Sequence, residues 1–109
     1  MSIYEDILYA INNLIVLEFY YGESYRLVEP HVLGVHNSKI QTLCYQLNGD
    51  SASGGIPEWR RFDNDSISNI VFSKERFTAP RSTRGGKHSV FDKKIAIANG
   101  IVIDGVELK

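Results

Sequence analysis

The part of the sequence that decides the fold reads IVLEFYY at residues 15–21, GES at 22–24 and YRLVEPH at 25–31. Apolar residues alternate in the first segment, so its odd-numbered positions are expected on one face of a strand and its even-numbered positions on the other. A glycine with polar neighbours is typical of a tight turn, and the aromatic and β-branched residues that follow favour a second strand over residues 25–35. The stretch therefore predicts a β-hairpin, with Pro30 at a bulge or an edge position.

The flanking segments predict one helix and further strands. Ser2 and Glu5 have the spacing of a capping box, and apolar residues follow at helical spacing, so a helix is expected over residues 3–14. Phe77 is expected to plug one end of the fold after a short helical turn. The expected strands cover residues 40–47, 59–63, 66–72 and 90–98, and the strand at 66–72 is expected to continue the one at 59–63. An Asn99-Gly100 turn is expected to lead from the last of these strands into residues 101–103. Loops are expected over the glycine-bearing residues 48–58 and the polar residues 78–89.

The length of 109 residues predicts a single domain over residues 1–109, and a content of 43% hydrophobic and 23% charged residues is typical of soluble globular proteins. No apolar run approaches the roughly 20 residues that cross a bilayer, and the beginning of the chain has no secretion signal. A cytoplasmic location without membrane contact is therefore expected. The lone Cys44 agrees with a reducing compartment and is expected to be buried and inert.

Arginines within strand-like, aromatic segments are the first candidates for function. A guanidinium is costly inside a small sheet unless it has a partner or faces a site, and its rigid fork of donors suits carboxylates and phosphates. Residues 1–58 hold two basic residues against seven acidic ones, whereas residues 59–94 hold nine against four. This asymmetry indicates either an anion-facing surface or two halves that pair with each other.

The candidate site combines these arginines with aromatic rings, which together hold the phosphates and bases of nucleotides or single strands. Arg26 and Arg60 are expected to form its floor, with the loop around residues 51–55 as a lid that offers amides and hydroxyls to an anion. The candidate ligand-binding residues are Tyr21, Arg26, His31, Tyr45, Ser51, Ser53, Trp59, Arg60 and Arg61.

Structural interpretations of the same residues stay open. Arg26 has Glu18 and Glu29 as potential ion-pair partners, and Arg60 has Glu58 and Asp63. The aromatic residues, Trp59 in particular, are equally suited to filling a core.

Catalytic motifs are not found. The segment after Gly49 has Ser53 where a nucleophile elbow needs glycine, the histidines lack zinc-ligand spacing, and Arg84 to Lys87 lacks the leading glycine of a phosphate loop. We therefore expect no enzymatic activity, no metal and no cofactor.

The order of these residues resembles the WYL domain, a bacterial module with an Sm-like fold. The resemblance covers roughly residues 10–80 and rests on Tyr21, Arg26, the Val28 to Pro30 step, the strand at Leu43 to Gln46, Arg60 to Phe62, and Ile67 or Ile70. The Trp-Tyr-Leu tripeptide that names the family is missing, and Ile40-Gln41-Thr42 stands near its place.

The resemblance implies a mainly β fold, an Sm-like small β-barrel of about five strands with an N-terminal α-helix. It also implies a sensor of an anionic, nucleotide-like or single-stranded nucleic-acid ligand, of the kind found in transcription regulators and antiviral systems of bacteria or phage. The alternative is a protein-interaction domain that assembles through open strand edges. Under either interpretation a homo-oligomer is expected.

Overall fold

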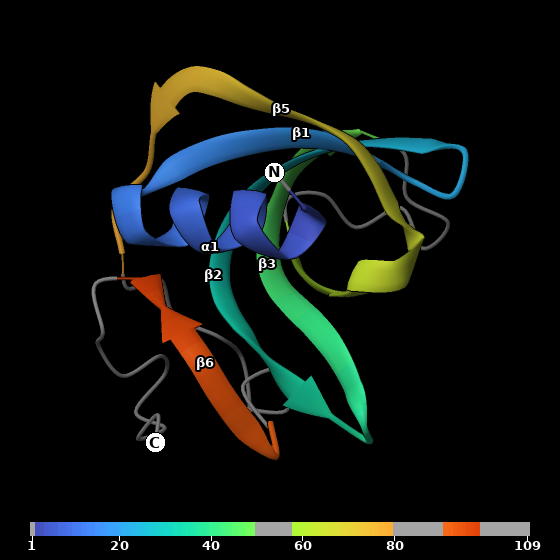
Figure 1. Ribbon diagram of the computed structural model, residues 1–109. Helices are drawn as coiled ribbons and strands as arrows, with labels where there is room; N and C mark the ends of the chain where they lie inside the picture. The colour runs from blue at the N-terminus through green and yellow to red at the C-terminus, as the bar shows by residue number, and fades with distance from the viewer. Residues whose placement is uncertain (1, 50–57, 80–90, 99–109) are drawn as a thin grey trace.

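The molecule is built from one helix and one antiparallel sheet, seen in a computed structural model that describes residues 2–49, 58–79 and 91–98 (Figure 1). The strands pair in the order β4-β3-β2-β1-β5, and β6 pairs separately with β2. The mainly β prediction with an N-terminal helix is confirmed, with six strands among the described residues. The elements are α1 (Ile3–Asn13), β1 (Ile15–Tyr21), β2 (Ser24–His36), β3 (Lys39–Gly49), β4 (Glu58–Asp63), the 3-10 turn η1 (Asn64–Ser66), β5 (Ile67–Arg76) and β6 (Lys93–Ile97).

The predicted hairpin is confirmed in β1 and β2. Their register runs from Leu17 opposite Val28 to Tyr21 opposite Ser24, and Gly22 adopts a φ of 63° in the turn. The alternation holds for buried Phe19 and exposed Tyr20 but is wrong for Val16, which is buried. Val16 belongs to the same core cluster as Leu17, so both faces at the beginning of β1 are covered.

The long strand β2 changes neighbours along its length. Its first part pairs with β1 and its last part with β6, while β3 follows it throughout. The register with β3 shifts between Pro30 and Val32, which confirms the predicted bulge. A proline cannot donate to the ladder and a bulge bends its strand, and Figure 1 shows that β2 is a curved strand.

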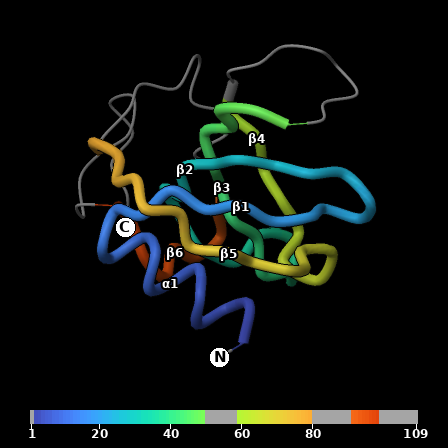
Figure 2. The backbone as a smooth tube through the Cα atoms, turned by 90° about the horizontal axis from the view of Figure 1, so that it is seen from above, coloured from blue at the N-terminus to red at the C-terminus, as the bar shows by residue number. Residues whose placement is uncertain are grey.

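The turn η1 joins the two end strands of the main sheet. Figure 2 shows the chain passing from β4 through η1 into β5, which lies beside β1 rather than continuing β4 as the sequence predicted. Gly22 N donates to Ser66 O at 3.1 Å and Asp63 N donates to the Tyr21 hydroxyl at 3.1 Å, so the turn is tied to the hairpin. Among the described strands the sheet remains open, with β4 and β5 at its ends.

The helix α1 packs against β1, β2, β5 and β6. Its capping box is formed as predicted: Ser2 Oγ accepts from Glu5 N, and the Glu5 carboxylate accepts from Ser2 N. Its own residues Ile7, Ala10 and Ile11 are fully buried. With 11 residues, α1 is too short to cross a bilayer, and the described part of the chain has no other α-helix.

Phe77 is buried in the main core, yet the short helical turn expected before it is wrong. The strand β5 runs to Arg76, and Phe77 N then donates to Leu14 O at 2.9 Å, which extends the pairing with β1. The strand expected over residues 90–98 is shorter, at Lys93–Ile97. The loop predicted over residues 48–58 is wrong at its ends, since Asn48 and Gly49 belong to β3 and Glu58 to β4. Its residues 50–57, residues 80–89 of the loop predicted over 78–89, the Asn99-Gly100 turn and the strand expected at 101–103 lie outside the described residues.

Candidate functional site

Arg26 lies on the core-facing side of the hairpin. It is in register with the buried Phe19 of β1, and opposed residues in an antiparallel pair point to the same face. Its guanidinium carbon is 5.8 Å from the centre of the Tyr21 ring and 5.5 Å from that of Phe62. Both distances fall within the range of cation–π attraction. The half-buried cation is therefore bordered by two aromatic rings.

The groups around Arg26 are held in place by further contacts. Arg26 Nη1 donates to Gln46 Oε1 at 2.9 Å, and Gln46 is fully buried with its Nε2 donating to Asn48 O at 3.3 Å. The ring centroids of Tyr21 and Phe62 lie 4.8 Å apart, edge to face. We call Tyr21, Arg26, Gln46 and Phe62 the Arg26 cluster. Its guanidinium is positioned before any ligand arrives.

Arg60 and Arg61 are neighbours in β4 and lie on opposite faces of the strand. Arg60 is in register with Cys44 and lies two positions before Phe62 in β4, so the three side chains share one face of the sheet. Cys44 and Phe62 both belong to the main core cluster. Arg61 is in register with Leu43, which belongs to a second cluster with Trp59. Gln46 follows Cys44 by two positions in β3, so Arg60 shares its face of the sheet with the Arg26 cluster.

Arg61 is engaged on the other face. Its guanidinium carbon lies 4.2 Å from the centre of the Phe91 ring, and Nη1 donates to Gln41 Oε1 at 3.3 Å. Partial burial lowers the pKa of Arg61, although an arginine remains charged at neutral pH. Arg61 therefore serves at least in part to cover Phe91.

The other predicted aromatic residues form a packed group beside Arg61. Trp59 is 7% exposed, and its ring centroid lies 5.4 Å from that of Tyr45 and 4.9 Å from that of His31. His31 is fully buried and its Nε2 lies 3.1 Å from Glu29 Oε1. Burial and the Glu29 charge raise the pKa of Cys44 well above its ordinary value.

The structure thus divides the predicted site. It places Tyr21, Arg26 and Arg60 on one face, and His31, Tyr45, Trp59 and Arg61 on the other. Ser51 and Ser53 lie outside the described residues. Among the described residues, no group of three or more histidine, cysteine, aspartate or glutamate side chains is arranged to hold a metal ion.

Three of the four carboxylates considered as structural partners of the arginines have other contacts, and the side chain of the fourth, Glu58, lies outside the described part of the structure. Glu18 Oε1 accepts from the Tyr25 hydroxyl at 3.0 Å, and Glu29 pairs with His31. Asp63 Oδ1 accepts from Gln41 Nε2 at 2.6 Å. These hydrogen bonds orient the three acidic groups toward neutral amides, a hydroxyl and an imidazole.

Gln46 and Phe62 belong to the Arg26 cluster but were absent from the predicted site, and Gln46 had the weaker signal. The only signal was a glutamine within the apolar strand segment at residues 43–47, at a position whose burial becomes visible once β3 is paired on both sides. Comparison of the chain with protein-family models, curated proteins and solved structures finds no match.

Proposed function

We propose that this protein is a non-enzymatic regulatory module that binds an anionic, nucleotide-like molecule at the Arg26 cluster. The observation that carries the proposal is the Arg26 guanidinium, which lies beside the paired Tyr21 and Phe62 rings and is held by the buried Gln46. A cation that is already oriented loses little conformational freedom when it binds an anion.

Arg60 supplies a second positive charge on the same face of the sheet. Two guanidinium groups near aromatic edges suit a phosphate that is joined to a planar base, because charge and stacking act on adjoining parts of one ligand. The excess of basic over acidic residues within positions 59–94 also favours the binding of an anion. We place this binding in the cytoplasm, with a role in transcription control or phage defence.

The finer fold assignment, an Sm-like barrel of the WYL type, belongs to the same proposal. Two features support it: the register shift of β2 after Pro30, and the three-residue turn η1 that joins the end strands β4 and β5.

The proposal is tested by titrating the protein with nucleoside monophosphates and short single-stranded oligonucleotides at near-physiological salt. Arg26→Gln should weaken binding by about 1.5–3 kcal/mol, because a charge-assisted hydrogen bond is lost. Lys74→Ala is the matched control, since Lys74 is exposed on β5 and its removal deletes the same charge. Equal affinities for the original protein and Arg26→Gln would contradict the proposal.

A second candidate is assembly of copies through a strand edge. The end strand β5 carries Val71, 55% exposed, and Phe72, 36% exposed. An exposed edge strand with apolar side chains favours pairing with another chain. This candidate predicts a homo-oligomer whose formation needs no ligand.

A further inference from the structure

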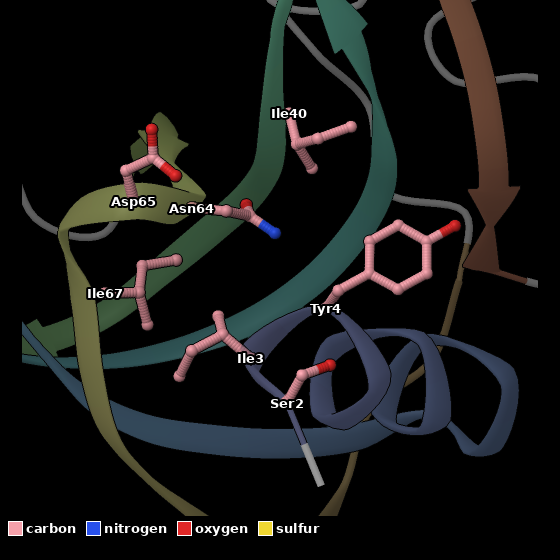
Figure 3. A pocket seen from close by; sticks show the side chains of 7 residues that line it. All are labelled: Ser2, Ile3, Tyr4, Ile40, Asn64, Asp65 and Ile67. Atoms are coloured by element: carbon pink, nitrogen blue, oxygen red, sulfur yellow. The ribbon is translucent and has the colours of Figure 1, made fainter.

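A pocket of about 350 Å³ lies where the beginning of α1, the beginning of β3 and the turn η1 meet. Figure 3 shows the side chains that line it. Three isoleucines and a tyrosine ring supply apolar walls, while a serine, an asparagine and an aspartate add polar groups. The lining residues are Ser2, Ile3, Tyr4, Ile40, Asn64, Asp65 and Ile67. None of them belongs to the Arg26 cluster.

Asn64 gives this pocket a specific donor. Its side chain is 8% exposed, and Oδ1 accepts from the buried Thr42 hydroxyl at 2.6 Å. Its Nδ2 is buried and has no hydrogen-bond partner among the described residues. In Figure 3 this nitrogen points into the space between Ile40 and Tyr4. A buried amide donor without a partner is unfavourable, so an acceptor at this point would be bound.

The surroundings determine which acceptor fits. Glu5 and Asp6 lie in the first turn of α1, and Asp65 borders the pocket directly. A carboxylate at the border of the pocket disfavours an anionic ligand, and the walls of Ile3, Ile40 and Ile67 favour an apolar body.

We infer that this pocket binds a small neutral molecule with a carbonyl acceptor on an apolar body, such as an aromatic amide or lactam, with Asn64 Nδ2 as the donor. Tyr4 and Ile40 are each 36% exposed, and such a ligand enters the pocket past these two side chains. The site is independent of the Arg26 cluster, because its ligand is neutral and its lining residues are different.

The test follows the side-chain amide signal of Asn64 by NMR during titration with three probes that share one ring. Benzamide carries the neutral acceptor, toluene lacks it, and benzoate carries a negative charge. Benzamide should shift this signal together with the backbone signals of Tyr4 and Ile40. Toluene and benzoate should bind about tenfold more weakly, or weaker still, because toluene lacks the hydrogen-bond acceptor and the negative charge of benzoate is repelled by the Asp65 carboxylate. Benzoate or toluene binding as tightly as benzamide would overturn the inference, as would benzamide leaving the Asn64 signal unmoved.

Variants separate a specific site from surface adsorption. Asn64→Asp keeps the acceptor for Thr42 but removes the donor, so benzamide affinity should fall about tenfold. Ile40→Trp places a larger side chain at a partly exposed wall of the pocket and should also block benzamide, which keeps the inference testable if Asn64→Asp does not fold. Val71→Ala, at an exposed position of β5, is the control and should bind normally. Unchanged benzamide binding in folded Ile40→Trp would overturn the assignment.

Discussion

In each of the two proposed sites, a single buried polar residue holds a neighbouring side chain in place. Gln46 holds Arg26, and Thr42 orients Asn64, through hydrogen bonds of 2.9 Å and 2.6 Å. Buried polar groups are normally satisfied in this way, and the satisfied end of each side chain fixes where the other end points. The position of each proposed donor is thus set by a hydrogen bond with a buried neighbour.

The pH dependence of stability should reveal the buried thiol of Cys44. Its pKa is raised by burial and by the Glu29 charge, so the folded chain retains a proton that the unfolded chain releases. The corresponding stabilisation is complete below the unfolded pKa, near pH 8.5–9, and is lost as the pH rises through the folded pKa. The free energy of unfolding should therefore fall above about pH 9, with a contribution of up to roughly 1.4 kcal/mol per pH unit.

Urea unfolding of the original protein and of Cys44→Ala at several pH values checks this expectation. The variant should be less stable at neutral pH because a cavity is formed, but its stability should fall less steeply at alkaline pH. Identical slopes for the two proteins would show that Cys44 ionises equally well in the folded state.

At the same scale, the sequence identified the arginines but not their partners. Arg26 and Arg60 are conspicuous because they interrupt aromatic strands. Gln46 and Asn64 are not, since a single polar residue acquires a role only through a neighbour that is distant in the chain. Thr42 and Asn64, for example, are 22 positions apart.

The elements show the same division between local and distant information. The hairpin of β1 and β2, the capping box of α1 and the bulge at Pro30 depend on nearby residues, and all three were predictable. The pairing of β5 with β1 was not, because the three residues of η1 do not reveal that the chain crosses to the other end of the sheet. In β4, Trp59 and Phe62 are both apolar but lie on opposite faces, so the pattern could not decide between Arg60 and Arg61 as the inward residue.

The edge of β5 provides the test of assembly. If copies pair through this strand, Val71→Lys should lower the mass measured by light scattering to that of a monomer, because a charge on an edge opposes pairing. Glu75→Lys, at another exposed position of the same strand, controls for a change of charge. A monomer at every concentration of the original protein would exclude assembly through this edge.

At the scale of the whole molecule, the two faces of the sheet carry different chemistry. The face of Arg26, Gln46 and Arg60 places cations beside the main core, whereas the face of Trp59 and Arg61 packs around Phe91. The proposed ligand therefore binds one face of the sheet. Adjacent residues of one strand point to opposite faces, so their substitution can test this proposal.

The most direct measurement compares Arg60→Ala with Arg61→Ala in titrations with the nucleotide or oligonucleotide that binds the original protein. Both variants lose one positive charge from adjoining positions of β4, so the overall charge is matched. Arg60→Ala should weaken binding about tenfold or more, whereas Arg61→Ala should change it by less than about threefold. An equal or larger loss for folded Arg61→Ala would contradict the assignment of the ligand to the face of Arg26.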